Sequence, residues 1–288
     1  MTADAELLVQ LVNPGRLTAV VDIGLGPVRP DPPYRRMLDR RLCSVIALAP
    51  MTDPRTPHPP PATDLETHLP YMAGDGTSAV LRLCEAPGMN SLLAPDPLVL
   101  ECFGQYAAWG QVVAEQPVAT HRLDDIAEIG TLDLLRIDTQ GTELSVFGGG
   151  ASRLASAVAV QTKVCFMPLY NDQPLFADID EALRAQDFTL HIFDEVQRVL
   201  IRPMAFHDDP YKTINQGVFC DVVYVRDFTR IGDISTDQLR QLALIAHYCF
   251  RSYDLTGKCL EGLMARNEVS PDALGRYVEG MASRMIAR

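Results

Sequence analysis

The chain has 288 residues, 47% of them hydrophobic, and a formal net charge of -12. This length and composition suffice for the core of one large domain, and the acidic balance argues against nucleic acid or an anionic membrane as a partner. The six His and seven Cys show no HExxH or CxxC spacing, so we expect neither a metal site nor a disulfide framework. No apolar run has transmembrane length and the first residues do not resemble a secretory signal, so we expect a cytoplasmic protein.

In the first part of the chain, short apolar runs alternate with turn residues. A helix is expected over residues 5–12, and buried strands are expected over residues 17–23 and 42–48. The prolines between these two strands allow a helix to begin only near Tyr34. The proline-rich residues 50–64 predict an extended surface loop.

The next segment has strand patterns separated by turns. A third strand is expected over residues 68–73, ending at the turn Gly74-Asp75-Gly76. The alternating residues 78–84 should pair back on this strand as a hairpin. Residues 112–121 are expected to be extended, and a short helix should follow over residues 123–126.

The most informative stretch is TLDLLRIDTQGTELSVF, from Thr131 to Phe147. An apolar run ends at Asp138, and the chain then turns through Gly141 into a helix, as a buried strand of an α/β sheet does. Ligands of open α/β sheets bind beyond the carboxyl ends of the strands, so Asp138 lies where a site would be. The other interpretation is that Asp138 only caps the following helix.

A similar pattern follows the first strand, which runs into Asp22-Ile23-Gly24-Leu25-Gly26. An acid followed by two glycines lets the backbone approach a ligand closely, as in nucleotide-binding α/β folds. No third glycine completes GxGxxG, so an ordinary tight turn is the alternative.

The rest of the chain continues the alternation of strands and helices. Strands are expected over residues 157–166, 188–193 and 218–225, with an amphipathic helix over residues 175–186. A loop, not a crossover helix, precedes the last strand. These patterns predict an α/β fold with a doubly wound, mostly parallel seven-stranded sheet of the class I methyltransferase type, Rossmann-like, whose last strand is antiparallel.

We expect three segments: an N-terminal helix (1–16), a Rossmann-like domain (17–228) and a C-terminal helical extension (229–288). The extension has an apolar stripe that must be covered, either by the same domain or by a second copy in a homodimer. The stripe comprises Leu239, Leu242, Ala246 and Phe250.

Four motifs resemble the FkbM-like family of S-adenosylmethionine-dependent methyltransferases. They are VVDIG (20–24), RLDDI (122–126), LDLLRIDTQGTELSVF (132–147) and PLYNDQPLFADIDEALRAQDF (168–188). The resemblance covers roughly residues 17–227. It implies S-adenosylmethionine as the cofactor and O-methyl transfer to a hydroxyl of a sugar or small natural product.

The resemblance also implies roles for individual residues. Asp138 would lie near the sulfonium and orient or deprotonate the acceptor hydroxyl, whereas Glu143 would be structural. The methionine part of the cofactor would lie against the first turn, and its adenine amine would face Asp75. The implied cofactor-binding residues are Asp22, Gly24, Gly26, Asp75, Asn90 and Ser91.

The chain also departs from the family pattern. Ala49 stands where an acid usually accepts from both ribose hydroxyls, and Asp53 could replace it from the loop. Lys163 and Cys165 occupy a strand in which the family tends to show an acid. Losing a hydrogen bond to a charged group costs about 1.5–3 kcal/mol, and several such losses together could abolish cofactor binding. The alternative function is therefore that of a catalytically silent homologue that acts as a binding or partner module.

Overall fold

The structure is a computed structural model that describes residues 3–24, 31–48, 50, 55, 61, 63–194, 196–206 and 212–285. In this part of the chain, the larger sheet has eight strands. Seven of them follow the order β3-β2-β1-β7-β8-β11-β9, and β10 pairs with the first residues of β11. The strands are β1 (Thr18–Gly24), β2 (Cys43–Leu48), β3 (Glu66–Leu69), β7 (Leu134–Asp138), β8 (Ala159–Cys165), β9 (Phe188–Phe193), β10 (Gln197–Val199) and β11 (Gln216–Arg226).

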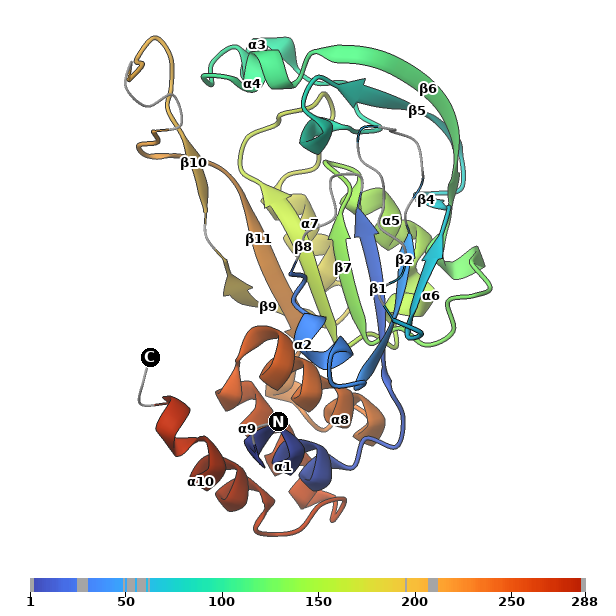
Figure 1. Cartoon of the computed structure of the whole chain (residues 1–288), viewed down its shortest axis with the longest axis vertical. Helices are drawn as coiled ribbons and strands as arrows, with labels where there is room; N and C mark the ends of the chain where they lie inside the picture. Colours follow the sequence, from blue (N-terminus) through green and yellow to red (C-terminus); the bar gives the residue numbers. More distant parts are fainter. Residues whose placement is uncertain are drawn as a thin grey trace.

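The strand directions confirm the predicted fold. β3, β2, β1, β7 and β8 are parallel, and β11 is antiparallel to both β8 and β9. This order, with one antiparallel strand near the end, is that of a class I methyltransferase. The carboxyl ends of the parallel strands meet at one edge of the sheet (Figure 1).

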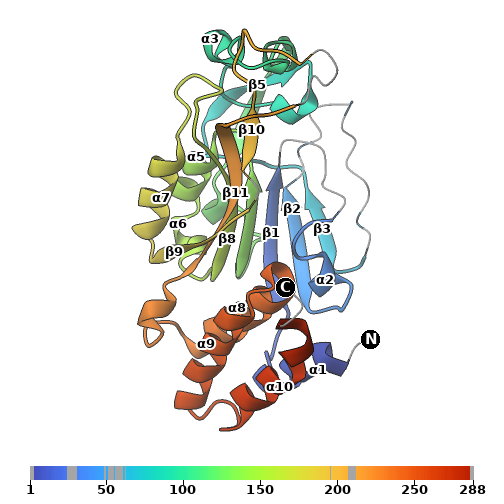
Figure 2. The ribbon, with the colours of Figure 1, turned by 90° about the vertical axis from the view of Figure 1, so that its left-hand side faces the viewer.

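Helices cover one face of this sheet along its length. They are α5 (Glu143–Gly149), α6 (Ala151–Leu154) and α7 (Phe176–Arg184), preceded by the short 3-10 helix η2 (Leu123–Asp125). Figure 2 shows all three α-helices on the same side of the strands. Alternate side chains of the strands, among them Val21, Ile137 and Val160, form a core with these helices.

A second group of helices packs at the amino ends of the strands (Figure 1). Their shared core includes Leu8, Val20 and Val225, so it joins the start of the chain, the sheet and the C-terminal residues. The group comprises α1 (Ala3–Val12), α2 (Arg35–Leu38), η3 (Phe228–Arg230), α8 (Thr236–Ile245), the π-helical turn η4 (Ala246–Phe250), α9 (Tyr253–Ala265) and α10 (Ala273–Met285).

The C-terminal apolar stripe is covered within the same chain. Leu239, Leu242 and Ala246 are fully buried, and Phe250 packs against the same core. This face is therefore not available to a second copy. A homodimer through these helices would have to use another of their surfaces.

A smaller lobe lies beyond the carboxyl edge of the main sheet (Figure 1). Its strand β6 is parallel to β4 and antiparallel to β5. The lobe contains β4 (Met72–Ala73), β5 (Ser78–Cys84), the 3-10 turn η1 (Pro87–Met89), α3 (Pro97–Leu100), α4 (Tyr106–Trp109) and β6 (Val112–His121).

The predicted hairpin between residues 68–73 and 78–84 is wrong, because β5 pairs with β6. The expected third strand is divided at Pro70, with β3 in the main sheet before it and β4 in the lobe after it. β3 is the edge strand of the main sheet, and Pro70, which has no N–H to donate, follows its last residue. The turn then packs tightly on β6, since a Cβ at Gly74 would lie 2.7 Å from Cβ of Thr120.

Candidate active site

One glycine and three charged residues form a row across four neighbouring strands at the carboxyl edge. In register, Gly24 of β1 lies opposite Asp138 of β7, and Lys163 of β8 lies opposite Asp221 of β11. Asp138 and Lys163 form an ion pair of 2.9 Å. The ammonium of Lys163 is also 3.9 Å from Asp221. The row therefore runs Gly24, Asp138, Lys163, Asp221 on one face of the sheet.

Two residues earlier on the same face, Asp22 of β1 lies opposite Arg136 of β7. Nη1 of Arg136 donates to Oδ1 of Asp22 at 2.7 Å, and the hydroxyl of Tyr34 donates to Oδ2 at 2.6 Å. Burial alone would lower the pKa of Arg136, but the carboxylate of Asp22 raises it, so the guanidinium stays charged. Both carboxylate oxygens of Asp22 thus have protein donors.

The turn after β7 is held by its own side chains. Nε2 of Gln140 donates to Oδ1 of Asp138 at 2.7 Å. The carboxylate of Glu143 accepts from the backbone N–H of Thr139 at 2.8 Å and of Gly141 at 3.0 Å. Burial, and next the negative charge of Asp138, raise the pKa of Glu143 to about 7. Glu143 therefore fixes the turn, which agrees with the structural role expected for it.

Gly141 is required in this turn for two reasons. Its φ of +108° lies in a region that residues with a side chain rarely adopt. A Cβ there would also lie 3.0 Å from Cδ1 of Leu93. The glycine lets the loop from the smaller lobe lie directly on the turn.

Ser91 joins the lobe to this turn. Its buried hydroxyl donates to the carbonyl of Gln140 at 2.7 Å and accepts from the N–H of Leu93 at 3.0 Å. The side-chain oxygen of the neighbouring Asn90 accepts from the N–H of Cys84 at 2.9 Å, inside the lobe. Ser91 thus lies in the wall of the candidate site, and Asn90 holds the lobe behind it. Their roles toward a cofactor stay predictions.

The remaining predicted cofactor residues are not brought to this cluster by the described structure. Asp75 is exposed in the turn after β4, where it accepts from the N–H and hydroxyl of Thr77. That turn packs against Gly149, which is at the other end of α5 from Asp138. The predictions for Gly26, Ala49 and Asp53 lie outside the described residues.

The partners of the predicted acids do not follow from the sequence in the same way as the acids themselves. Arg136 is two residues before Asp138 on a strand, so the period of two could have placed both on one face. Asp221 and Tyr34 show no comparable pattern, because their places depend on strand register and on helix packing. In the sequence, Lys163 stands out only as a departure from the family pattern.

The residues that could hold the amino-acid part of S-adenosylmethionine are Asp22 and Arg136, a carboxylate beside a guanidinium. The two are already paired with each other, so a bound α-ammonium and α-carboxylate would share their charges. Gln161 lies opposite Arg136, and its buried Oε1 has no hydrogen-bond partner among the described residues. The buried Oγ1 of Thr139 also has none there. Such groups gain from a polar ligand.

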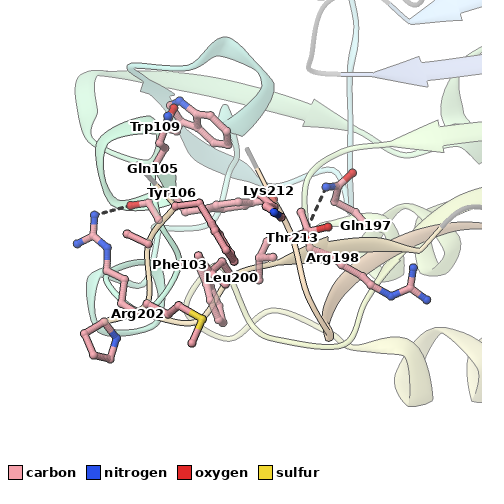
Figure 3. A pocket seen from close by; sticks show the side chains of 16 residues that line it. Phe103, Gln105, Tyr106, Trp109, Gln197, Arg198, Leu200, Arg202, Lys212 and Thr213 are labelled. Atoms are coloured by element: carbon pink, nitrogen blue, oxygen red, sulfur yellow. Dashed lines mark hydrogen bonds between the residues drawn. The ribbon is translucent and has the colours of Figure 1, made fainter. Parts of the chain in front are cut away.

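A cavity of about 570 Å³ lies between the lobe on one side and β10 with the segment after it on the other (Figure 3). Its wall includes the aromatic residues Phe103, Tyr106 and Trp109 from the lobe. Gln197 and Lys212 contribute from the other side. This volume is in the range of small-molecule sites.

Neither a metal-binding group nor a membrane-spanning helix is found among the described residues. No group of three or more His, Cys, Asp or Glu side chains there is arranged to hold a metal ion. Within the same residues, no helix is both long and apolar enough to cross a bilayer.

The strand order is that of the class I methyltransferase fold. Residues 19–190, more than half of the chain, match the methyltransferase FkbM domain. The chain belongs to this family of S-adenosylmethionine-dependent methyltransferases. A search of curated protein sequences finds no match.

Among solved structures, the chain is similar to the magnesium protoporphyrin IX methyltransferase ChlM from Synechocystis PCC 6803. The comparison with its SAH-bound crystal structure gives 10% identity, a TM-score of 0.33 and coverage of 77% of this chain and 81% of that chain. The SAM-bound structure gives 14% identity, a TM-score of 0.29 and 77% of each chain. The similarity is distant, so no site residue is transferred from ChlM.

Proposed function

We propose that this protein transfers a methyl group from S-adenosylmethionine to a hydroxyl of a sugar or small natural product. The observation that carries the proposal is the largely buried Asp138–Lys163 ion pair, in which Asp138 stands opposite Gly24 at the carboxyl edge. This is the edge at which open α/β sheets bind their ligands. It also lies within the segment that matches the FkbM domain.

The charges of the cluster suit this chemistry. When bound, S-adenosylmethionine supplies an electrophilic methyl group on a positively charged sulfonium. Three carboxylates, Asp22, Asp138 and Asp221, face two cations, Arg136 and Lys163, and leave the cluster with one negative charge. A net negative site favours a cationic ligand over its neutral product.

Asp138 would bind the acceptor. Its carboxylate can accept a hydrogen bond from the acceptor hydroxyl, aim an oxygen lone pair at the methyl group, and take the hydroxyl proton as the methyl group is transferred. Lys163 and Gln140 hold this carboxylate in place, at 2.9 Å and 2.7 Å. Lys163 can in addition donate to the acceptor oxygen and fix its position.

Calorimetric titration with S-adenosylmethionine and with S-adenosylhomocysteine tests the cofactor part. Saturable binding at micromolar concentrations is expected. Methyl transfer to a panel of hydroxylated sugars, followed by mass spectrometry, tests the chemistry, with Asp138→Asn as the variant and the exposed Asp64→Asn as its control. Transfer that is unaffected by Asp138→Asn would contradict the assigned role.

One observation favours the second candidate function, a silent homologue that binds a ligand or partner. Tyr34 and Arg136 already supply donors to both oxygens of Asp22, as an ammonium would. A silent homologue would show no binding of S-adenosylmethionine at millimolar concentration while remaining folded. The same titration therefore separates the two functions.

A further inference from the structure

We propose that the methyl acceptor is a vicinal diol, whose two neighbouring hydroxyls bind to Asp138 and Asp221 on either side of Lys163, and that the hydroxyl at Asp138 is the one methylated. The inference rests on the proposed function and adds to it the chemical class of the acceptor. It is carried by the geometry of one ammonium between two carboxylates.

The side chains of Asp138, Lys163 and Asp221 converge on one place of the sheet face. They come from the neighbouring strands β7, β8 and β11, which lie side by side in Figure 1. Lys163 lies opposite Asp221 in register and forms the ion pair with Asp138. The three side chains are 17%, 10% and 16% exposed in chain order. They are held by their strands, yet each remains partly accessible to a ligand.

The two distances from the ammonium differ. Nζ of Lys163 lies 2.9 Å from Oδ2 of Asp138, which is the length of a hydrogen bond. It lies 3.9 Å from Oδ1 of Asp221, which is too long for one. A hydroxyl can bridge this longer distance by accepting from the ammonium and donating to the carboxylate. An ammonium donates up to three hydrogen bonds, so Lys163 can bind a hydroxyl while it stays paired with Asp138.

Both positions require a group that donates and accepts at once. An oxygen beside Asp138 and Lys163 must donate to the carboxylate and accept from the ammonium, and an oxygen between Lys163 and Asp221 must do the same. A hydroxyl does both, whereas an ammonium ligand has no acceptor and an ionised carboxylate has no donor. Because the two positions share one ammonium, the two hydroxyls must be on adjacent carbons. Sugars, cyclitols and catechols carry such diols.

The strand order assigns the hydroxyl that is methylated. Asp138 stands opposite Gly24 of β1, whereas Asp221 lies two strands farther from β1. The methyl donor is proposed to bind at β1, so it reaches the hydroxyl at Asp138. The oxygen–carbon bond forms as the bond between sulfur and the methyl carbon breaks, and the hydroxyl proton goes to Asp138. The hydroxyl at Asp221 keeps its proton, so the product is a monomethyl ether.

Phe219 provides an apolar surface next to the two hydroxyl positions. It lies two residues before Asp221 on β11, and therefore on the same face of the sheet. Its ring centroid is 4.8 Å from Nζ of Lys163. The carbon skeleton that carries the diol can pack against this ring, as flat or cyclic groups do on aromatic side chains. We therefore expect a diol on a ring.

Ligand-observed NMR titrations of the full chain test the inference, with and without S-adenosylhomocysteine. One set of probes is catechol, its monomethyl ether guaiacol, and phenol. The other is cis-1,2-cyclohexanediol, its monomethyl ether, and cyclohexanol. The diol of at least one set should bind about tenfold more tightly than its ether and its mono-alcohol, and the set that shows this identifies an aromatic or an aliphatic ring. Equal affinities within both sets would overturn the inference.

Variants localise the second hydroxyl. Asp221→Asn keeps the shape with a weaker acceptor, and Asp221→Ala removes the acceptor. Either should reduce the preference for the diol to less than about threefold while the affinity for the mono-alcohol stays the same. The control is Asp64→Asn, since Asp64 is 69% exposed and paired with Arg41, and it should keep the full preference. A preference that survives in both folded Asp221 variants, or that falls equally in Asp64→Asn, would overturn the inference.

The outcome is separable from that of the proposed function, because S-adenosylmethionine binding is measured independently. If the cofactor binds but diols bind no better than mono-alcohols, the acceptor class is wrong and methyl transfer stands. If diols are preferred but the cofactor does not bind, the methyltransferase proposal fails.

Discussion

Arg136 and Asp22 stand opposite each other on β7 and β1, and Nη1 of Arg136 lies 2.7 Å from Oδ1 of Asp22. Their side chains are only 12% and 14% exposed, so either charge would be costly without the other. The pair also sits two residues before Gly24 and Asp138 on the same face. It therefore links the stability of the carboxyl edge to the proposed recognition of the cofactor.

Asp22→Ala is expected to lower the affinity for S-adenosylmethionine at least tenfold, which is about 1.4 kcal/mol. The carboxylate is lost as an acceptor for the α-ammonium, and Arg136 is left without its partner. The free energy of unfolding should also fall, by about 3–5 kcal/mol for a broken buried pair. Calorimetry measures the first quantity and denaturant titration the second.

Asp133→Ala is the matched control for this variant. Asp133 is fully buried and is paired with Arg16 at 2.6 Å, but it precedes β7 and lies at the opposite edge of the sheet. It should lose comparable stability and keep its cofactor affinity. Equal losses of affinity in the two variants would mean that Asp22 acts only through stability.

The sequence predicts the main sheet well because its strands are short apolar runs with acids or turns at their ends. β7 is an example, ending at Asp138 as the apolar run does. The smaller lobe was less predictable, because β5 pairs with β6 across the insertion that contains α3 and α4. A pairing between segments so far apart is not encoded in the local pattern of either strand.

Strand direction and strand register also explain which residues of the candidate site could be predicted from the sequence. Asp22, Gly24 and Asp138 follow buried strands, so their meeting at one edge could be predicted from strand direction. The period of two places Arg136 on the face of Asp138, but its pairing with Asp22 depends on strand register, as does the pairing of Lys163 with Asp138. Single-strand patterns contain no information on register.

Asp138→Asn is expected to lower the rate of methyl transfer at least a hundredfold, the lower end of what a positioned acid or base contributes. The amide keeps the shape but weakens the hydrogen bond to the acceptor and removes the ion pair of 2.9 Å with Lys163. Asp221→Asn serves as the control, since Asp221 is 3.9 Å from Lys163 and so contributes less. Initial rates with a saturating acceptor should separate the two variants. Equal rate losses would show that both carboxylates act only by fixing Lys163.

Ser91→Ala is expected to lower the free energy of unfolding by about 1–3 kcal/mol, the cost of leaving buried groups without partners. The substitution removes the hydrogen bonds to Gln140 and Leu93, both inside the fold. If Ser91 also binds the cofactor, S-adenosylmethionine should stabilise the variant less than it stabilises the native chain. Thermal melts with and without the cofactor give this difference, and equal stabilisation would contradict the predicted cofactor contact.

Glu143 should make stability depend on pH. Its pKa is raised from 4.5 to about 7, so between these values the folded chain binds the proton and the unfolded chain does not. The stability from this proton is fully present below pH 4.5 and is lost as the pH rises through 7. Over this window the loss should be about 3 kcal/mol.

Glu143→Gln cannot titrate and should lack this loss. Denaturant titrations from pH 4 to pH 8 compare it with the native chain and with Glu181→Gln, whose side chain is exposed on α7. The Glu181→Gln curve should run parallel to the native one. A parallel curve for Glu143→Gln would show that the buried carboxylate stays ionised across this range.

The last prediction concerns the C-terminal helices. Leu242 of α8 is fully buried in the core shared with α1 and the sheet, so Leu242→Ala should cost about 2–5 kcal/mol of unfolding free energy. Val278 of α10 is 46% exposed, and Val278→Ala should change stability little.

Sedimentation of the same variants tests association. If the full chain is a dimer, its interface must lie outside this buried stripe, so a folded Leu242→Ala variant should keep the dimer while melting at a lower temperature. A Leu242→Ala variant that becomes monomeric without losing stability would show that the stripe belongs to an interface between chains.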